Sequence, residues 1–341
     1  MNSKEKKSEM QSSNRILWLD TLRGLACLIV FFAHVIARFP ETVDYSYGVG
    51  KIGVWFFMVS GGYLLLMSGK TEKIGIKWIL RFYVKKIVKI YPCLIIGVLL
   101  TWYAGLMEKC DIIKNLLLIK GSAHLWFIPV IIKFYLIAPL FIVFDRIVKN
   151  DLVKAVSFLG IGTVAAIVWP FTKYPENSIE LRWYVPVFMM GIIIYYISKH
   201  IKNEDGKLRI LGDMLAVGAA IGIIMLTPLV RLKLLGLDNP WFLQNKYIFL
   251  GLLWSVMIIG ILMGRVVKKL LEMIKPLQML SVISYPVYIF HYPVIFLLIW
   301  LFEPSVVLLF IEAFVATLII SVIYNFIFGL VVRLVKKDGD R

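Results

Sequence analysis

The sequence contains few charged residues and few cysteines. Only 17% of its 341 residues are charged, and its three cysteines are Cys27, Cys93 and Cys110. Their spacing matches neither a disulfide framework nor a metal-binding motif, so we expect no bound metal. Internal repeats, low-complexity tracts and a basic soluble domain are also missing. The last absence argues against nucleic-acid binding, despite a net charge of +17.

Apolar residues dominate the chain instead. Hydrophobic residues make up 60% of it and the mean hydropathy is +0.84, which exceeds the values of soluble domains. We therefore predict an all-α fold, a polytopic membrane helix bundle in contact with membrane lipids. The length allows about ten transmembrane helices, which we place at residues 16–37, 48–68, 90–107, 124–145, 152–171, 182–198, 208–230, 246–264, 279–301 and 305–332.

The placement of Lys and Arg predicts the orientation of this bundle. With the N-terminus inside, the cytoplasmic segments hold 26 of these residues and the outer segments hold 10, in accord with the positive-inside rule. Both termini are then cytoplasmic, and a polar tail at 1–15 and a basic tail at 333–341 flank a membrane domain at 16–332. No cleavable signal peptide is expected, because the first apolar run carries Asp20 and Arg23.

Arg23 and His34 both lie within the first predicted span. Eleven steps of 100° return a helix to about 20° from its start, so the two side chains project from one face, about 16 Å apart along the axis. Asp20 lies about 40° away on the same side. Ionisable groups within a span normally face the protein interior or a wet cavity. The first span therefore predicts a polar path through the membrane.

A basic amphipathic helix is predicted at about 74–89 on the cytoplasmic side. Lys77, Arg81, Lys85 and Lys89 recur every four residues and form a stripe on one helix face. An interfacial helix that rests on anionic lipid is the favoured interpretation. The alternative is a docking surface for a phosphorylated cytosolic ligand.

The second span contains Ser60, Gly61 and Gly62 within an aromatic run. Small residues allow helices to approach closely, and this is the favoured interpretation. The alternative is that these residues line a cavity.

Polar residues also mark the fourth and the last span. His124 and Trp126 lie where the fourth span begins on the outer side, and an aromatic belt accounts for Trp126. Lys133 lies deeper, so it either pairs with an acid or lines a polar cavity. Glu312, about two turns into the last span from the outside, is the expected partner of Lys133.

In the ninth span, Ser284, Tyr288 and His291 lie three and four residues apart and share one face. His291 falls near the middle of the span, at a depth comparable to that of His34. A lone histidine in a bundle is usually a hydrogen-bonded structural residue. Two histidines at similar depth, with an arginine below one of them, favour a functional site.

These segments, in this order, resemble the acyltransferase-3 family, whose members are integral-membrane acyltransferases that modify surface sugars and related acceptors. Five motifs extend the resemblance from about residue 16 to residue 332. They are Leu19-Asp-x-Leu-Arg-Gly-Leu-Ala with His34, Gly53-Val-x-Phe-Phe-x-x-Ser-Gly61, the basic cluster from Phe82 to Pro92, Leu125-Trp-Phe with Tyr135 and Pro139, and Ile283-Ser-Tyr-Pro-Val-Tyr-Ile-Phe-His291.

Two features depart from the family pattern. The basic cluster carries Lys85, Lys86 and Lys89 where arginines are common, so the charge is kept but bidentate contacts to phosphate are lost. The fourth span also lacks the Glu-Glu pair that some members carry, with Ile131 and Ile132 in those places. The chain therefore resembles the shorter subgroup without a fused extracellular domain, whose members differ in function.

Acyl transfer from a thioester to a hydroxyl needs a base for the hydroxyl proton and a donor for the developing oxyanion. We assign His34 as the general base, with a transient acyl-histidine as the alternative route. Arg23 would hold the phosphate or pantetheine end of the donor. The resemblance implies acetyl-CoA, or another acyl-CoA, as a cytosolic co-substrate with no bound cofactor, and its anionic groups give Lys85, Lys86 and Lys89 a partner.

The resemblance also implies an acceptor hydroxyl on a cell-envelope glycan or lipid-linked sugar, at a bacterial cell membrane. The main alternative is a transporter or flippase of a polar or lipid-linked substrate, because intramembrane ionisable residues also line substrate paths. A non-catalytic sensing or scaffolding module is a third interpretation. Further candidates for the site are Asp20, Ser60, His124, Trp126, Lys133, Ser284, Tyr288, His291 and Glu312.

Overall fold

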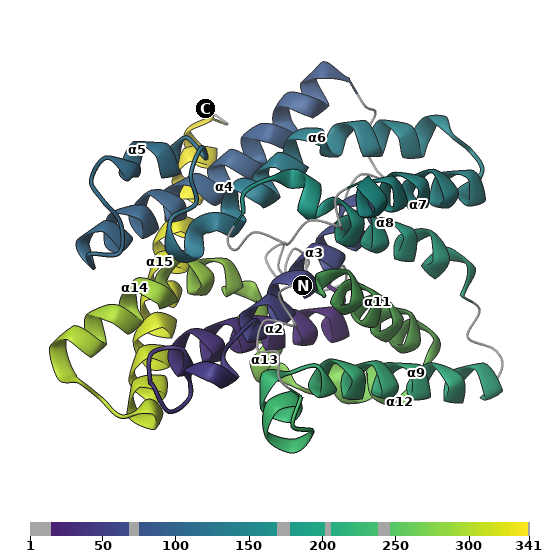
Figure 1. Ribbon diagram of the computed structural model, residues 1–341. Helices are drawn as coiled ribbons and strands as arrows, with labels where there is room; N and C mark the ends of the chain where they lie inside the picture. The colour runs from purple at the N-terminus through teal and green to yellow at the C-terminus, as the bar shows by residue number, and fades with distance from the viewer. Residues whose placement is uncertain (1–14, 68–74, 169–177, 202–205, 238–245, 340–341) are drawn as a thin grey trace, which may run out of the picture.

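The computed structural model describes residues 15–67, 75–168, 178–201, 206–237 and 246–339. This part of the chain is helical and contains no strand (Figure 1). The predicted polar tail lies outside the described residues except for Arg15. The helices are α2 (Leu17–Ile36), η1 (Val43–Tyr45), α3 (Val49–Met67), α4 (Ile76–Tyr103), α5 (Asp111–Leu116), η2 (Ala123–Trp126), α6 (Phe127–Ile147), α7 (Asp151–Val168), η3 (Leu181–Trp183), α8 (Val185–His200), α9 (Gly206–Met225), η4 (Leu229–Leu234), α11 (Tyr247–Met263), α12 (Val266–Glu272), α13 (Lys275–Val282), α14 (Ser284–Phe302) and α15 (Val306–Gly339).

Within these ranges, seven helical segments are long and apolar enough to cross a membrane: α2, η1 with α3, η2 with α6, α7, α9, α14 and α15. The pair of α11 and α12, bent by 97°, raises the number to eight. Helix α8 has 16 residues and α4 has 28, and they overlap the spans predicted at 182–198 and 90–107. Every predicted span corresponds to a helix, and the polytopic all-α bundle is confirmed.

The basic helix predicted at about 74–89 and the span predicted at 90–107 form one helix, α4. Pro92 lies inside it and does not end it, as membrane helices tolerate proline. Exposed apolar side chains such as Leu80 and Val84 lie beside the basic residues. This is the pattern of a helix at a membrane interface.

Helices α3 and α8 cross at closely opposed glycines. A Cβ atom on Gly62 would lie 2.2 Å from the carbonyl oxygen of Phe188, and one on Gly191 would lie 2.0 Å from the carbonyl oxygen of Val59. Neither distance leaves room for a side chain. The neighbouring Gly61 differs, because its Cβ would make an ordinary contact of 3.6 Å with a Phe188 side-chain carbon. The predicted close approach of helices is confirmed at Gly62.

Helix α2 runs parallel to α14 and in register with it. The Cys27 thiol lies 3.9 Å from the carbonyl oxygen of Ser284. Seven residues further along each helix, ring nitrogens of His34 and His291 lie 2.7 Å apart. Gly24 allows a similarly close approach to α13, because a Cβ there would lie 2.1 Å from a backbone oxygen. Two segments far apart in sequence thus bring two intramembrane histidines into contact.

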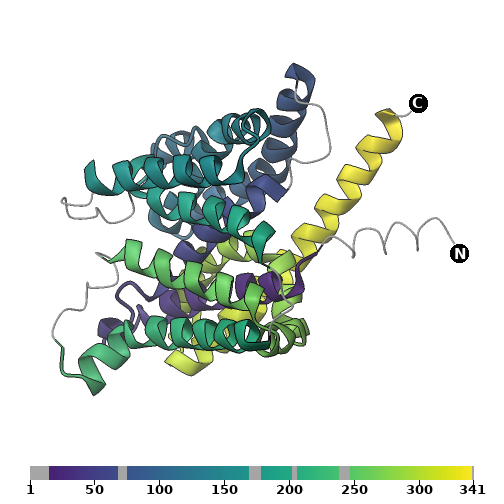
Figure 2. The ribbon, with the colours of Figure 1, turned by 90° about the vertical axis from the view of Figure 1, so that its right-hand side faces the viewer.

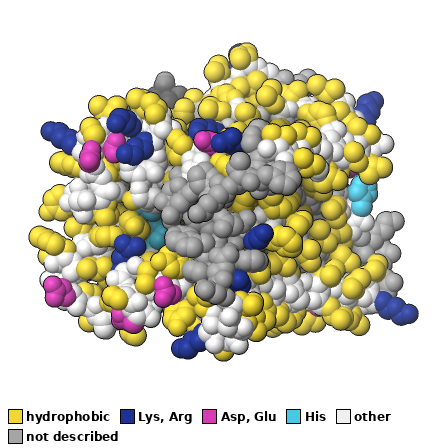
Figure 3. All heavy atoms as spheres, viewed as in Figure 1, with side chains coloured by type: hydrophobic (Ala, Val, Ile, Leu, Met, Phe, Trp, Pro, Cys, Tyr) yellow, Lys and Arg dark blue, Asp and Glu magenta, His cyan; other side chains and the backbone are white. Residues whose placement is uncertain are grey.

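Helices α2 and α3 lie near the middle of the bundle, between α14 and α15 on one side and α8, α9 and α11 on the other (Figure 1). The start of α2 and the end of α15 lie toward the same side (Figure 2), in agreement with the predicted orientation of the termini. Hydrophobic side chains cover much of the rim of the molecule (Figure 3). Those exposed on α7, α9 and α15 include Ile167, Met214 and Phe326, and they suit a lipid-facing surface.

Candidate active site

Three of the four histidines meet inside the bundle. His34 on α2 and His291 on α14 stack, with ring centroids 4.9 Å apart. His124 on η2 meets His291 edge-on, with centroids 5.4 Å apart. The sequence motifs indicated each histidine separately, and the fold brings the three side chains together.

The hydrogen bonds of His291 assign the tautomers of the His34–His291 pair. Nδ1 of His291 lies 2.7 Å from the carbonyl oxygen of Tyr288 and 3.1 Å from that of Val287. A carbonyl only accepts, so Nδ1 of His291 carries the proton and its Nε2 is an acceptor. Nδ1–H of His34 then donates to Nε2 of His291. In neutral His34, Nε2 therefore keeps its lone pair and can accept a proton.

His124 is held by backbone groups of the same region. Its Nε2–H donates to the carbonyl oxygen of Ile289 at 2.9 Å, and the Tyr288 hydroxyl donates to the His124 carbonyl oxygen. Nδ1 of His124 is then an acceptor, and it is buried without a hydrogen-bond partner. A buried acceptor without a partner is costly, and an entering hydroxyl would satisfy it.

A cavity of about 270 Å³ borders His34 and His124, and we call it the outer cavity. It lies by the connection between α2 and α3 and by the start of η2, on the side that the predicted orientation assigns to the outside. Such a volume suits a small polar ligand rather than a macromolecule. Its lining includes Val30, His34, Arg38, Ser46, Tyr47, Lys51, His124, Trp126, Tyr288 and Tyr292.

Two cations line the outer cavity. The Arg38 guanidinium lies 4.9 Å from the centre of the Phe296 ring and 5.8 Å from that of Tyr292. The Lys51 ammonium lies 3.7 Å from the centre of the Trp126 ring, and Lys51 is only 8% exposed. Both contacts have cation–π geometry. No Asp or Glu is among the described residues that line the cavity.

Sequence reasoning missed Arg38, Lys51 and Tyr292. Arg38 and Lys51 lie at the outer ends of predicted spans, and their charges were used only to predict the orientation of the bundle. Arg38 follows His34 by four residues and Tyr292 follows His291 directly. This proximity in sequence is the signal that would have included Arg38 and Tyr292, and Lys51 has no such signal.

Asp20 accepts hydrogen bonds from two side chains at the end of α2 that is predicted to be cytoplasmic. Its carboxylate accepts from Arg15 Nε at 2.8 Å and from the Ser281 hydroxyl at 3.1 Å. The Arg23 guanidinium lies 3.7 Å from the same carboxylate, and its side chain is 32% exposed. This distance exceeds that of a tight hydrogen bond. Arg23 thus keeps donors available for a ligand.

Lys89 of α4 lies near Arg23, and Lys86 lies near Lys89. The Lys86 ammonium lies 4.0 Å from the centre of the Tyr135 ring. Lys89 is within electrostatic range of Arg23, Lys86 and Tyr135. Lys85 is exposed on the same helix. We call Arg23, Lys86 and Lys89 the cytoplasmic cluster.

Tight packing separates the cytoplasmic cluster from the histidines. The space between them is a cavity of about 10 Å³, which is room for about one water molecule. A pantetheine arm does not fit in this cavity, so passage through it requires side chains to move. The space is lined by Cys27, Val30, Phe31, Phe57, Val287, Tyr288 and His291.

Two predicted site residues, Ser60 and Ser284, donate to backbone carbonyl oxygens three residues earlier in the chain. Ser60 is buried and its hydroxyl donates to the Phe57 carbonyl oxygen at 3.3 Å. The Ser284 hydroxyl donates to the Ser281 carbonyl oxygen at 2.8 Å. Neither serine lines the outer cavity, so the structure favours packing over cavity lining for Ser60.

The predicted ion pair between Lys133 and Glu312 is wrong. Lys133 donates instead to the carbonyl oxygen of Ile179 at 2.6 Å. Oε2 of Glu312 on α15 is buried without a hydrogen-bond partner. Neither side chain lines the outer cavity. The sequence positions of Lys133 and Glu312 indicated their depth in the membrane but not the direction in which each side chain points.

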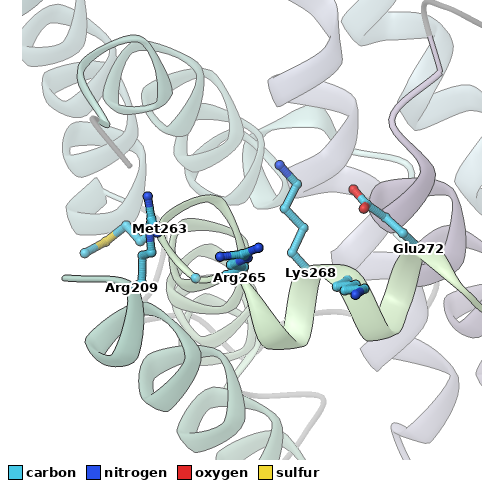
Figure 4. A pocket seen from close by; sticks show the side chains of 7 residues that line it. Arg209, Met263, Arg265, Lys268 and Glu272 are labelled. Carbon is cyan, nitrogen blue, oxygen red and sulfur yellow. The ribbon is translucent and has the colours of Figure 1, made fainter. Parts of the chain in front are cut away.

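A second cavity, of about 480 Å³, lies where α9 meets the bend between α11 and α12. Arg209 on α9 faces Met263 and Arg265, and Lys268 and Glu272 project from α12 (Figure 4). This cavity shares no lining residue with the outer cavity. Its cations belong to segments predicted to be cytoplasmic.

Comparisons with known proteins identify relatives of the chain. A family model described as an acyltransferase domain matches residues 16–326. The peptidoglycan O-acetyltransferase OatA of Listeria monocytogenes (serovar 1/2a) is 22% identical over 330 residues, which cover 85% of this chain and 51% of that protein. The O-acetyltransferase OatA of Staphylococcus aureus (strain NCTC 8325) is 22% identical over 325 residues, which cover 84% and 52%. The chain spans about half the length of these relatives. No solved structure matches it.

Proposed function

Because the chain belongs to the family of this acyltransferase domain, we propose that it moves an acetyl group from cytosolic acetyl-CoA to a hydroxyl of a cell-envelope glycan. It is an O-acyltransferase and a multi-pass protein of a bacterial membrane. One observation carries the proposal: within the described residues, the His34–His291 pair leaves Nε2 of His34 unprotonated and without a hydrogen bond beside the outer cavity.

His34 acts as the general base in this mechanism. The acceptor hydroxyl oxygen attacks the acetyl carbonyl carbon while Nε2 of His34 takes the hydroxyl proton. A C–O bond forms, the C–S bond of the thioester breaks, and the proton passes from His34 to the departing CoA thiolate. His291 is a positioning residue, because its Nε2 holds Nδ1–H of His34 and thereby fixes the tautomer.

The cytoplasmic cluster supports a CoA donor. CoA is strongly anionic, and Lys89 lies within electrostatic range of both Arg23 and Lys86. Arg23 and His34 lie on the single helix α2, where a rise of 1.5 Å per residue separates them by about 16 Å. An extended pantetheine arm bridges such a distance. Opening of the narrow space around Phe57 and Tyr288 is therefore a step of the proposed reaction.

The acceptor side of the proposal rests on the outer cavity and on the relatives. The cavity joins polar groups to aromatic rings, as sugar sites do. One relative is named a peptidoglycan O-acetyltransferase, and we propose an acceptor of the same broad kind, a glycan of the cell envelope.

Proteoliposomes provide the test. Labelled acetyl-CoA is supplied on the side of the cytoplasmic cluster, and cell-envelope extract is supplied on the side of the outer cavity. The expected result is labelled extract with an equal amount of released CoA. Movement of unmodified extract components without CoA release would support a transporter instead. Absence of both donor binding and CoA release would overturn the proposal.

A further inference from the structure

We propose that the acceptor is an anionic sugar, whose acidic group binds between Arg38 and Lys51 in the outer cavity. This inference rests on the proposed function and specifies the chemical class of its acceptor. The acidic group is a carboxylate or a phosphate, since both complement a guanidinium and an ammonium.

The charge of the cavity is the first argument. Arg38 and Lys51 both line it, and no Asp or Glu is among its described lining residues. Arg38 forms no ion pair with any described residue, and its Nε is buried without a hydrogen-bond partner. A guanidinium nitrogen shielded from water is costly unless an acceptor or an anion accompanies it. A ligand with negative charge would compensate the Arg38 guanidinium.

The rings and the size of the cavity are the second argument. Trp126, Tyr47 and Tyr292 line it beside the cations. Aromatic faces pack against apolar surfaces, while their polar ends and the Ser46 hydroxyl can bond to hydroxyls. The volume of about 270 Å³ suits one sugar ring rather than an extended chain.

The position of Arg38 relative to His34 is the third argument. Both contact Tyr292: the His34 ring centroid lies 5.0 Å from that of Tyr292, and the Arg38 guanidinium lies 5.8 Å from it. Arg38 and Lys51 are both within electrostatic range of His34. A sugar held by its acidic group would therefore present a hydroxyl to Nε2 of His34. Binding of the acidic group at a distance from the reacting atoms would orient the acceptor hydroxyl for reaction.

Equilibrium dialysis tests the inference without requiring turnover. Protein in nanodiscs is dialysed against labelled glucuronate, labelled glucose 6-phosphate and labelled glucose. We expect at least one of the two acids to bind about tenfold more tightly than glucose. The acid that binds more tightly identifies the preferred acidic group, which is a carboxylate in glucuronate and a phosphate in glucose 6-phosphate. If neither acid binds more tightly than glucose, the inference is overturned.

Charge-removing variants sharpen the test. Arg38→Gln and Lys51→Met should each weaken binding of the preferred acid about tenfold and leave glucose unchanged. Lys233→Gln is the matched control, because Lys233 is exposed and does not line the cavity. Equal losses for acid and glucose would contradict the assigned role.

Acetyl-CoA turnover, measured on the same samples, separates the two proposals. Absent turnover in the wild type would overturn the proposed function itself. Intact turnover without a preference for acids would overturn only this inference. Unchanged elution of the variants in size-exclusion chromatography excludes misfolding as the cause of weaker binding.

Discussion

Nδ1 of His34 lies 2.7 Å from Nε2 of His291, and this contact determines which nitrogen of His34 is available for chemistry. The backbone carbonyl of Tyr288 keeps the proton of His291 on Nδ1, so the donor in the pair is His34. The arrangement resembles the base and orienter of a catalytic triad, with a neutral imidazole in the place of the carboxylate. It also explains why two histidines at equal depth occur together.

Removal of the His291 acceptor should slow the chemical step without affecting donor binding. We expect His291→Leu to lower kcat about a hundredfold, because His34 loses its fixed tautomer. His291→Gln should recover part of this loss, since its amide oxygen can accept from Nδ1–H of His34. Steady-state kinetics in nanodiscs separate kcat from the KM for acetyl-CoA. Equal activity of the two variants would show that the hydrogen bond has no role.

Arg23 should govern affinity for the donor. We expect Arg23→Gln to raise the KM for acetyl-CoA about tenfold, because a charge-assisted contact to phosphate is lost. Arg23→Lys should have a smaller effect, since it keeps the charge but not the fork of donors. The KM of the wild type should also rise with ionic strength, and that of Arg23→Gln should rise less. A donor KM that is the same in all three proteins would contradict the cytoplasmic cluster as donor site.

The narrow space near Cys27 should limit the transfer step. Cys27→Leu adds volume to a cavity of about 10 Å³, so we expect transfer to fall about tenfold while donor binding persists. Cys27→Ala is the matched control, because it adds no volume. Acetyl-CoA binding and product formation are measured on the same samples. Transfer at the wild-type rate in Cys27→Leu would show that the acetyl group takes another route.

The contact of α3 with α8 should tolerate substitution at one glycine and not at its neighbour. Gly62→Ala places a Cβ 2.2 Å from the Phe188 carbonyl oxygen, so we expect it to cost about 1–3 kcal/mol of stability. Gly61→Ala meets only an ordinary contact of 3.6 Å and should be neutral. Thermal unfolding in detergent measures both. A Gly62→Ala variant as stable as Gly61→Ala would contradict the close helix approach.

The fold and half of the site could be predicted from the sequence for a physical reason. A membrane span is defined by its length and apolarity, so every predicted span overlaps a helix, and seven or eight of the described helical segments are long and apolar enough to cross a membrane. Depth follows from position along a span, and this was enough to indicate that His34 and His291 lie level. The resemblance to a family added His34 and Arg23 as a functional pair.

The remainder depended on how the helices face one another, which spacing does not specify. Lys133 and Glu312 have suitable depths but turn to different neighbours, so their predicted pair does not form. Arg38 and Lys51 lie at span ends, where cations are expected for orientation alone. Only the fold of the connection after α2 places them beside His34.

His34 takes the proton of the acceptor hydroxyl in the proposed reaction. The most direct test is acetyl transfer by wild type, His34→Gln and His200→Gln in nanodiscs with labelled acetyl-CoA and cell-envelope extract. His200 is the matched control, because it is exposed on α8 and lies away from the outer cavity. We expect His34→Gln to bind acetyl-CoA normally and to transfer at least about a hundredfold more slowly, while His200→Gln matches the wild type. Transfer by His34→Gln at the wild-type rate would contradict the account.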